Sequence, residues 1–182
     1  GSTNPQNWSV VRGNVSTTQA INTQSLNLRL YTSPAPYPNA YTNFELDNVS
    51  SIYGGNNSNS NSGILRYVRI EFAGKKTKNF GNFNALLLAG VGNKTILDNI
   101  MVSYCLGNAF EIYGGEVNLN KLVSFKTNSI DYRFNFGTQS KIDNSLAIRN
   151  SYVSSSSGSK CLSVLSYDTK SQVDFTKKHT SV

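Results

Sequence analysis

Two six-residue stretches, LDNIMV at residues 97–102 and LNKLVS at residues 119–124, align without a gap and predict a chain built from repeated coils. LRYVRI at residues 65–70 and IDNSLA at residues 142–147 fit the same alignment, and the four starts are separated by 32, 22 and 23 residues. Each stretch begins with an apolar residue, continues with a polar pair, and has apolar or small residues at its fourth and sixth positions. This pattern is expected of a strand that turns a corner and then alternates between inward and outward side chains.

A second set of short stretches, beginning at residues 84, 108, 131 and 161, lies between the first. Glycine follows several of them directly, where a left-handed backbone or a tight corner requires it: Gly90, Gly114, Gly115 and Gly137. A unit of about 22 residues with two or three short strands and corners of Asn, Gly and Ser predicts an all-β fold, a right-handed parallel β-helix (β-solenoid) with protruding loops. The leucine-rich repeat is the alternative at this length, but its consensus is absent.

Stacking explains the repeat, because a single coil cannot bury its apolar face alone. We expect one domain with three segments: residues 1–62 as an irregular N-terminal segment with the first coil or coils, residues 63–168 as the β-helix coils, and residues 169–182 as a C-terminal cap or tail. Two inward columns are predicted: Leu65, Leu97, Leu119 and Ile142 in one, and Val68, Ile100 and Leu122 in the other.

Composition excludes several classes of protein. The 182 residues include 24 Asn and 25 Ser, too polar for a helical bundle, and 11% aromatic residues, too many for plain disorder. The longest apolar run, residues 85–91, cannot span a bilayer, so we expect no transmembrane segment. The net charge of +7 favours acidic partners, but no recognition helix or aromatic RNA-binding motif accompanies it, so we expect no nucleic-acid partner.

Three motifs carry a family resemblance: GILRYVRIEFAG at residues 63–74, LLLAGVG at residues 86–92 and FEIYGG at residues 110–115. Together they resemble the secreted or outer-membrane lipoprotein β-helix proteins common in Bacteroidetes, most closely over residues 50–150. The resemblance implies a right-handed parallel β-helix and an extracellular or outer-membrane surface location, and it implies no particular reaction.

The same family usually carries paired acidic residues before the FExxGG strand and again one coil later, which could hold a hard cation. This chain has GN at residues 107–108 and NSID at residues 128–131 in those places. A calcium site is therefore not supported, and we expect no cofactor.

The candidate ligand site follows from the alignment, which puts Glu111 beside Arg133 on adjacent coils. The pair is interpreted first as a cross-strand salt bridge, and second as a carboxylate and a cation around an acidic sugar. Outward tyrosines can stack on sugar faces. We therefore place the ligand site at Glu111, Tyr113, Asp131, Tyr132 and Arg133, and we assign no catalytic and no metal-binding residue.

Other motifs have structural interpretations. The Asp-Asn pairs at residues 98–99 and 143–144 recur at one place in the coil, as turn chemistry predicts. Cys105 and Cys161 are expected to be small buried hydrophobes, although one disulfide stays open, and His179 is expected to be a solvated terminal residue. The tyrosines in or beside the coils pack under loops or face outward: Tyr53, Tyr67, Tyr104, Tyr113, Tyr132 and Tyr152.

These observations favour a non-catalytic cell-surface or secreted module with a binding or scaffold role. Its expected partner is a polysaccharide, bound as a glycan ligand, or another component of the cell envelope. Two alternatives stay open. One is a polysaccharide lyase or glycosidase that acts on acidic polysaccharide through Glu111, Asp131 and Arg133. The other is a structural fragment of a larger adhesin.

Overall fold

The computed structural model describes residues 28–31, 44–46, 49–51, 53, 57–74, 76–77, 81–152, 158–170, 173 and 177–182. In these ranges the regular structure consists of short strands, and no α-helix is present. The strands are β1 (Leu28–Tyr31), β2 (Phe44–Leu46), β3 (Val49–Ser51), β4 (Ile64–Glu71), β5 (Lys76–Thr77), β6 (Gly81–Asn82), β7 (Leu86–Ala89), β8 (Ile96–Ser103), β9 (Phe110–Tyr113), β10 (Asn118–Phe125), β11 (Ile130–Asn135), β12 (Lys141–Asp143), β13 (Leu146–Ile148) and β14 (Lys160–Val164).

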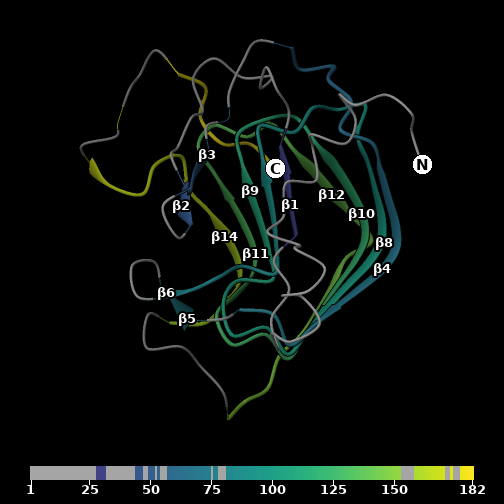
Figure 1. Ribbon diagram of the computed structural model, residues 1–182, viewed down its shortest axis with the longest axis vertical. Coiled ribbons are helices and arrows are strands. Elements are labelled where there is room, and N and C mark those ends of the chain that lie inside the picture. The colour runs from purple at the N-terminus through teal and green to yellow at the C-terminus, as the bar shows by residue number, and fades with distance from the viewer. Residues whose placement is uncertain are drawn as a thin grey trace.

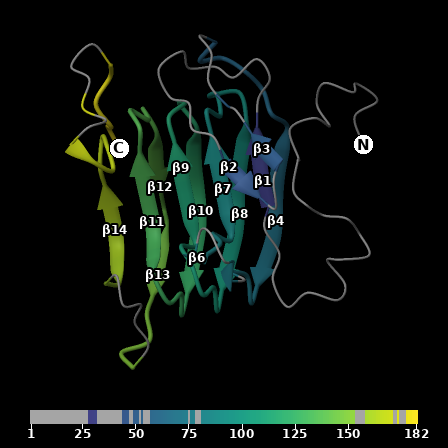
Figure 2. The same ribbon diagram turned by 60° about the vertical axis from the view of Figure 1, so that its left-hand side comes forward.

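Two parallel sheets form the body of the protein. The first sheet has the order β1-β7-β9-β11-β14, and the second has the order β12-β10-β8-β4, with β13 also paired to β10. Figure 1 shows the two sheets as facing layers, and in Figure 2 successive strands lie side by side in chain order. Because the chain contributes strands alternately to the two sheets, and all pairs within them are parallel, the fold is the predicted right-handed parallel β-helix.

The register confirms the predicted columns. Leu97 pairs with Leu65 on one side and with Leu119 on the other, and Leu119 pairs with Ile142. Leu97 and Leu119 are almost fully buried, and burying one leucine side chain stabilises the fold by about 1.5–3 kcal/mol. The interior is therefore a stack of aliphatic rungs.

The corners of the coils have left-handed backbone at fixed places. Asn99 and Asn144 have φ values of 54° and 50°, which confirms the corner predicted from the two Asp-Asn pairs. Gly90, Gly114 and Gly137 also have positive φ, as predicted from the glycines that follow the strands. Larger residues occupy equivalent corner positions at the same strained φ: Tyr67, Phe72, Tyr104, Lys121, Lys126 and Phe136.

A third, shorter side closes each coil. Glu116 N donates to Val91 O at 2.9 Å, and Gln139 N donates to Gly115 O at 2.9 Å. The C-terminal residues continue this side, since Ser181 N donates to Thr138 O at 2.8 Å.

The structure describes the segments outside the repeats to different extents. Much of the irregular N-terminal segment expected over residues 1–62 lies outside the described residues, but β1 pairs in parallel with β7, as a first coil would. The insertion between β4 and β7 contains the antiparallel hairpin β5–β6, which lies beside the two sheets in Figure 1. The division into three segments stays a prediction.

Candidate functional site

The Glu111–Arg133 pair lies where the alignment placed it. Glu111 on β9 pairs in register with Arg133 on β11, and Arg133 Nη1 lies 2.8 Å from Glu111 Oε1. Because Phe110 and Ile112 belong to the interior cluster, the alternation of side chains turns Glu111 to the outside of the coil. Glu111 is nevertheless only 1% exposed, so other groups cover it.

Three protein donors bind the Glu111 carboxyl. Arg133 and the Tyr113 hydroxyl donate to Oε1, and Asn108 Nδ2 donates to Oε2 at 3.2 Å. Burial raises the pKa of Glu111 above its ordinary value, and the three donors oppose that rise. A sugar hydroxyl would have to displace a protein donor to bind this carboxyl, which favours the structural interpretation of the pair.

Tyr113 is buried with the pair and is not an outward sugar-stacking surface. Its ring packs edge-on against Phe136, with ring centres 4.9 Å apart, and the Arg133 guanidinium lies 5.9 Å from its centre. Burial first and then the charge of Glu111 raise the pKa of Tyr113, so its hydroxyl remains a proton donor.

Arg133 has a second carboxylate partner that the sequence did not indicate. Its Nη2 donates to Asp168 Oδ1, and Asn135 Nδ2 donates to the same oxygen at 2.6 Å. Burial alone lowers the pKa of Arg133, but the negative charges of Glu111 and Asp168 and the hydroxyl of Tyr113 together raise it, so the guanidinium stays charged. The Arg133 and Asp168 side chains are 20% and 33% exposed, so solvent reaches this end of the network.

Asp131 belongs to a different buried network. Its carboxylate accepts hydrogen bonds from Arg149 Nη1 and from Ser124 Oγ, both at 2.5 Å. Arg149 also donates to Lys160 O at 3.2 Å, which ties this coil to the start of β14. The structure thus separates Asp131 from the Glu111 pair.

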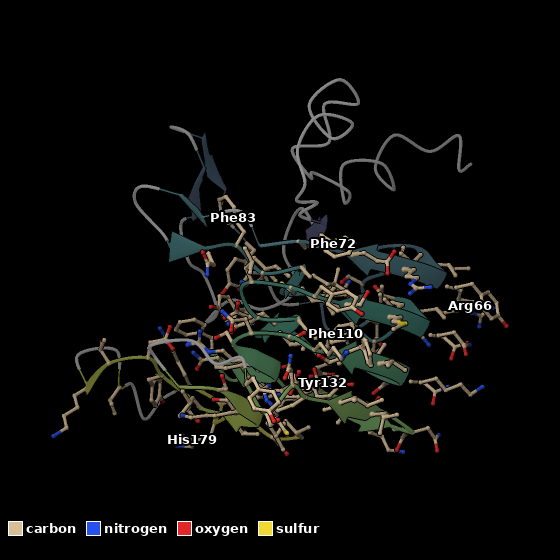
Figure 3. The ribbon with its side chains drawn as sticks, turned by 90° about the horizontal axis from the view of Figure 1, so that it is seen from below. Arg66, Phe72, Phe83, Phe110, Tyr132 and His179 are labelled. Atoms are coloured by element: carbon tan, nitrogen blue, oxygen red, sulfur yellow. The ribbon has the colours of Figure 1, made fainter. Side chains whose placement is uncertain are left out.

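The Tyr132 side chain faces the interior, so its predicted place in the ligand site with Glu111, Tyr113 and Arg133 is wrong. Its ring stacks on Phe110 in the interior, with centres 5.3 Å apart, and Figure 3 shows the two side chains one above the other. Its hydroxyl donates to Leu146 O at 2.7 Å. Consecutive residues of a strand face opposite sides, so the neighbour of an outward Arg133 must face inward.

Three accessible aromatic residues lie on the outer face of the second sheet. Tyr67 is 82% exposed, and Phe72 and Tyr104 are also exposed, whereas Tyr53 is buried. The Phe72 and Tyr104 rings are parallel with centres 5.2 Å apart, and Phe125 packs edge-on against Tyr104. The register accounts for this stack, because each of the two residues follows its strand directly, at one corner of adjacent coils.

Charged residues surround these rings. Arg69 Nε lies 2.9 Å from Glu71 Oε1, to which Ser103 Oγ also donates at 2.9 Å. Lys126 Nζ lies 5.9 Å from the centre of the Tyr104 ring. Within the described ranges no ion pair involves Lys121 or Lys126.

We name this surface the aromatic–basic face and define it by Tyr67, Arg69, Phe72, Tyr104, Lys121 and Lys126. Of these residues, the sequence indicated only Tyr67 and Tyr104 as outward aromatic residues. Phe72 and Lys126 occupy the same corner of their coils as Tyr104, so the alignment of the coils could have identified them as well.

The remaining reactive residues are two cysteines and one histidine. No group of three or more His, Cys, Asp or Glu residues that could hold a metal ion occurs among the residues that the structure describes. Both cysteines are free, and Cys105 is buried as expected, which raises its pKa to about 12. Cys161 is exposed, so the expectation that it is buried is wrong, because β14 is the edge strand of its sheet. His179 is exposed, and its ring lies edge-on to Tyr167.

Comparison with known proteins gives one family match. A family model described as a pectate-lyase-like β-helix domain matches residues 37–173. A search of curated proteins and a search of solved structures gave no match. In the described ranges, no helix is long and apolar enough to cross a membrane.

Proposed function

Because the chain belongs to the pectate-lyase-like β-helix domain family, we propose that it is a non-catalytic module that binds polysaccharide on its aromatic–basic face. The family fits a polysaccharide-related role in general. The observation that carries the proposal is the exposure of Tyr67 and of the Phe72–Tyr104 stack on one sheet face, beside charged groups. Exposed aromatic residues lose little entropy when they hold a ligand, because their side chains have only two torsion angles.

The surface offers complementary contacts to a glycan. The Tyr67 ring and the solvent-exposed parts of Phe72 and Tyr104 contact the apolar C–H faces of sugar rings. Arg69 and the neighbouring Glu71 hydrogen-bond sugar hydroxyls, and the lysines of β10 and its following corner attract acidic groups. Binding therefore combines apolar contact with a salt-dependent electrostatic contribution.

Substitution at the corner positions gives a clean test, because Asn99 and Asn144 already occupy the same corner column as Tyr67 with positive φ. Tyr67→Asn therefore removes a ring without adding backbone strain. Tyr104 lies in a different corner column, but its φ of 53° is also one that Asn tolerates, so Tyr104→Asn serves the same purpose. Each ring contact is worth about 1 kcal/mol, so each variant should bind polysaccharide roughly five- to tenfold more weakly. Tyr152→Asn, at an exposed tyrosine outside this face, is the matched control.

Binding should be measured by isothermal titration calorimetry against acidic and neutral polysaccharides. The proposal expects Lys121→Gln to weaken binding of acidic polymers while leaving neutral ones unchanged. Unchanged binding in both tyrosine variants, or no binding to any polymer of the panel, would count against the proposal. The second of these outcomes would favour the structural fragment of a larger adhesin.

A polysaccharide lyase or glycosidase is the second candidate, supported by the proximity of Glu111, Arg133 and Asp168. An assay for unsaturated or reducing-end products on acidic polysaccharides, with and without calcium, separates the two functions. Turnover that is lost in Glu111→Gln would replace the binding proposal with catalysis.

We also propose that the protein acts outside the cell or on the outer-membrane surface, as the family resemblance of its motifs implies. Protease treatment of intact cells tests this location. Digestion of the protein without lysis supports it, and protection until lysis contradicts it.

A further inference from the structure

We propose that Arg133 and Asn135 form a binding site for the carboxylate of a sugar acid, and that Asp168 of the chain itself occupies this site in the absence of a ligand. The two donors are two residues apart on β11, so their side chains lie on the same side of the strand. Both donate to one oxygen of Asp168. The site is distinct from the aromatic–basic face, which lies on the other sheet.

The two donors are held in place before any ligand arrives. Asn135 is fully buried, and its Oδ1 accepts a hydrogen bond from Phe136 N at 2.8 Å, which directs its amide N–H groups toward Asp168. Arg133 is fixed by Glu111 through Nη1, which leaves Nη2 for the second carboxylate. Its buried Nε makes no hydrogen bond with the described residues. Preorganised donors of this kind suit a carboxylate, for which a guanidinium supplies charge-assisted hydrogen bonds.

Asp168 is not part of any strand of the coil. It lies beyond the end of β14 and its side chain is partly exposed. The flanking residues have contacts of their own, because Thr180 Oγ1 donates to Leu165 O at 2.7 Å and Thr180 N donates to Ser166 Oγ at 3.1 Å. An incoming carboxylate therefore competes with the Asp168 carboxylate for Arg133 and Asn135.

The Asp168→Ala variant tests the site, because it removes the internal carboxylate and keeps both donors. Thermal unfolding should be followed at increasing galacturonate concentration, with sodium chloride added to constant ionic strength. A ligand that binds only the folded state raises Tm. We expect galacturonate to raise the Tm of Asp168→Ala saturably, and to act on the wild type only at concentrations at least tenfold higher. Galactose, which lacks the carboxylate, should have no effect.

Two further variants control the experiment. Asp143→Ala removes an exposed carboxylate that pairs with Lys141 elsewhere, and it should respond like the wild type. Asp168→Ala combined with Arg133→Gln should lose the response. Where Asp168→Ala does not fold, Asp168→Asn keeps the size of the side chain, removes its charge, and allows the same titration.

The proposal is overturned when galacturonate acts equally on the wild type and the Asp168 variants, when galactose acts as strongly, or when the Arg133→Gln combination still responds. Any binding of galacturonate or galactose at the aromatic–basic face is common to all variants, because Tyr67 and Tyr104 remain intact in each of them, so the proposal is judged on the differences in response between the variants.

Discussion

Replacing Arg133 by methionine should show how far the buried Glu111 depends on its partner. The substitution keeps much of the side-chain volume but leaves Glu111, which is 1% exposed, without its guanidinium. Removing one partner of a buried ion pair costs about 3–5 kcal/mol, because the other charge stays uncompensated. The Arg133 side chain is 20% exposed, which places the expected loss near the lower end, about 3 kcal/mol.

This loss corresponds to a fall in Tm of about 6–12 °C for a chain of this length. The expected dependence on pH follows from Glu111. Burial raises its pKa in the folded state, and Arg133→Met removes the largest influence that opposes the rise. A carboxyl whose folded pKa lies above its unfolded pKa destabilises the fold increasingly as pH rises through that interval. The loss should therefore be small below the ordinary pKa of glutamate and larger at neutral pH.

Urea unfolding followed by far-ultraviolet circular dichroism, at about pH 4 and about pH 8, measures this difference. Asp168→Ala measures the share of the loss that comes from the second partner of Arg133. Glu111→Gln combined with Arg133→Met removes both charges and should recover most of the stability at pH 8. A loss below about 1 kcal/mol, or an equal loss at both pH values, would refute the reasoning that Glu111 depends on a buried ion pair.

Three further predictions address the coil. Leu119→Ala should lower the free energy of unfolding by about 2–5 kcal/mol, whereas Val123→Ala, on the outer side of the same strand, should lower it by less than half as much in the same urea experiment. Asn99→Ala should cost about 1 kcal/mol at its positive φ and Asn99→Gly much less, so equal losses would contradict the corner assignment. An alkylating reagent should modify Cys161 but not Cys105 in the folded protein, because burial raises the pKa of Cys105 to about 12; mass spectrometry showing both modified at similar rates would oppose this.

The repeat made the backbone predictable. Leu97 and Leu119 recur at one place in successive units, and stacked coils pair equivalent residues, so the alignment also gave the register of Glu111 with Arg133. The alternation of side chains along the strand also predicts that Tyr132 faces the interior, because it is adjacent to the outward Arg133. The prediction that Tyr132 and Arg133 belong to one ligand site ignored this two-residue period of a strand.

The covering of the site was not predictable in this way. Asp168 lies 35 residues from Arg133 in the chain and beyond the end of β14, so no repeat spacing connects the two residues. The exposure of Cys161 depends likewise on β14 being the last strand of its sheet, which a local pattern does not reveal.

The sequence by itself determined the coil, its register and its corners, because these depend on the alternation of side chains and on residues that accept left-handed backbone, both of which are local properties repeated along the chain. Only the tertiary structure decided which outward residues remain accessible. It buried Glu111 and Tyr113 beside Asp168, and it left Tyr67 and Tyr104 in solvent. The physical reason is that burial on the outside of a β-helix depends on non-repeated segments, whose contacts are made through space and have no period in the sequence.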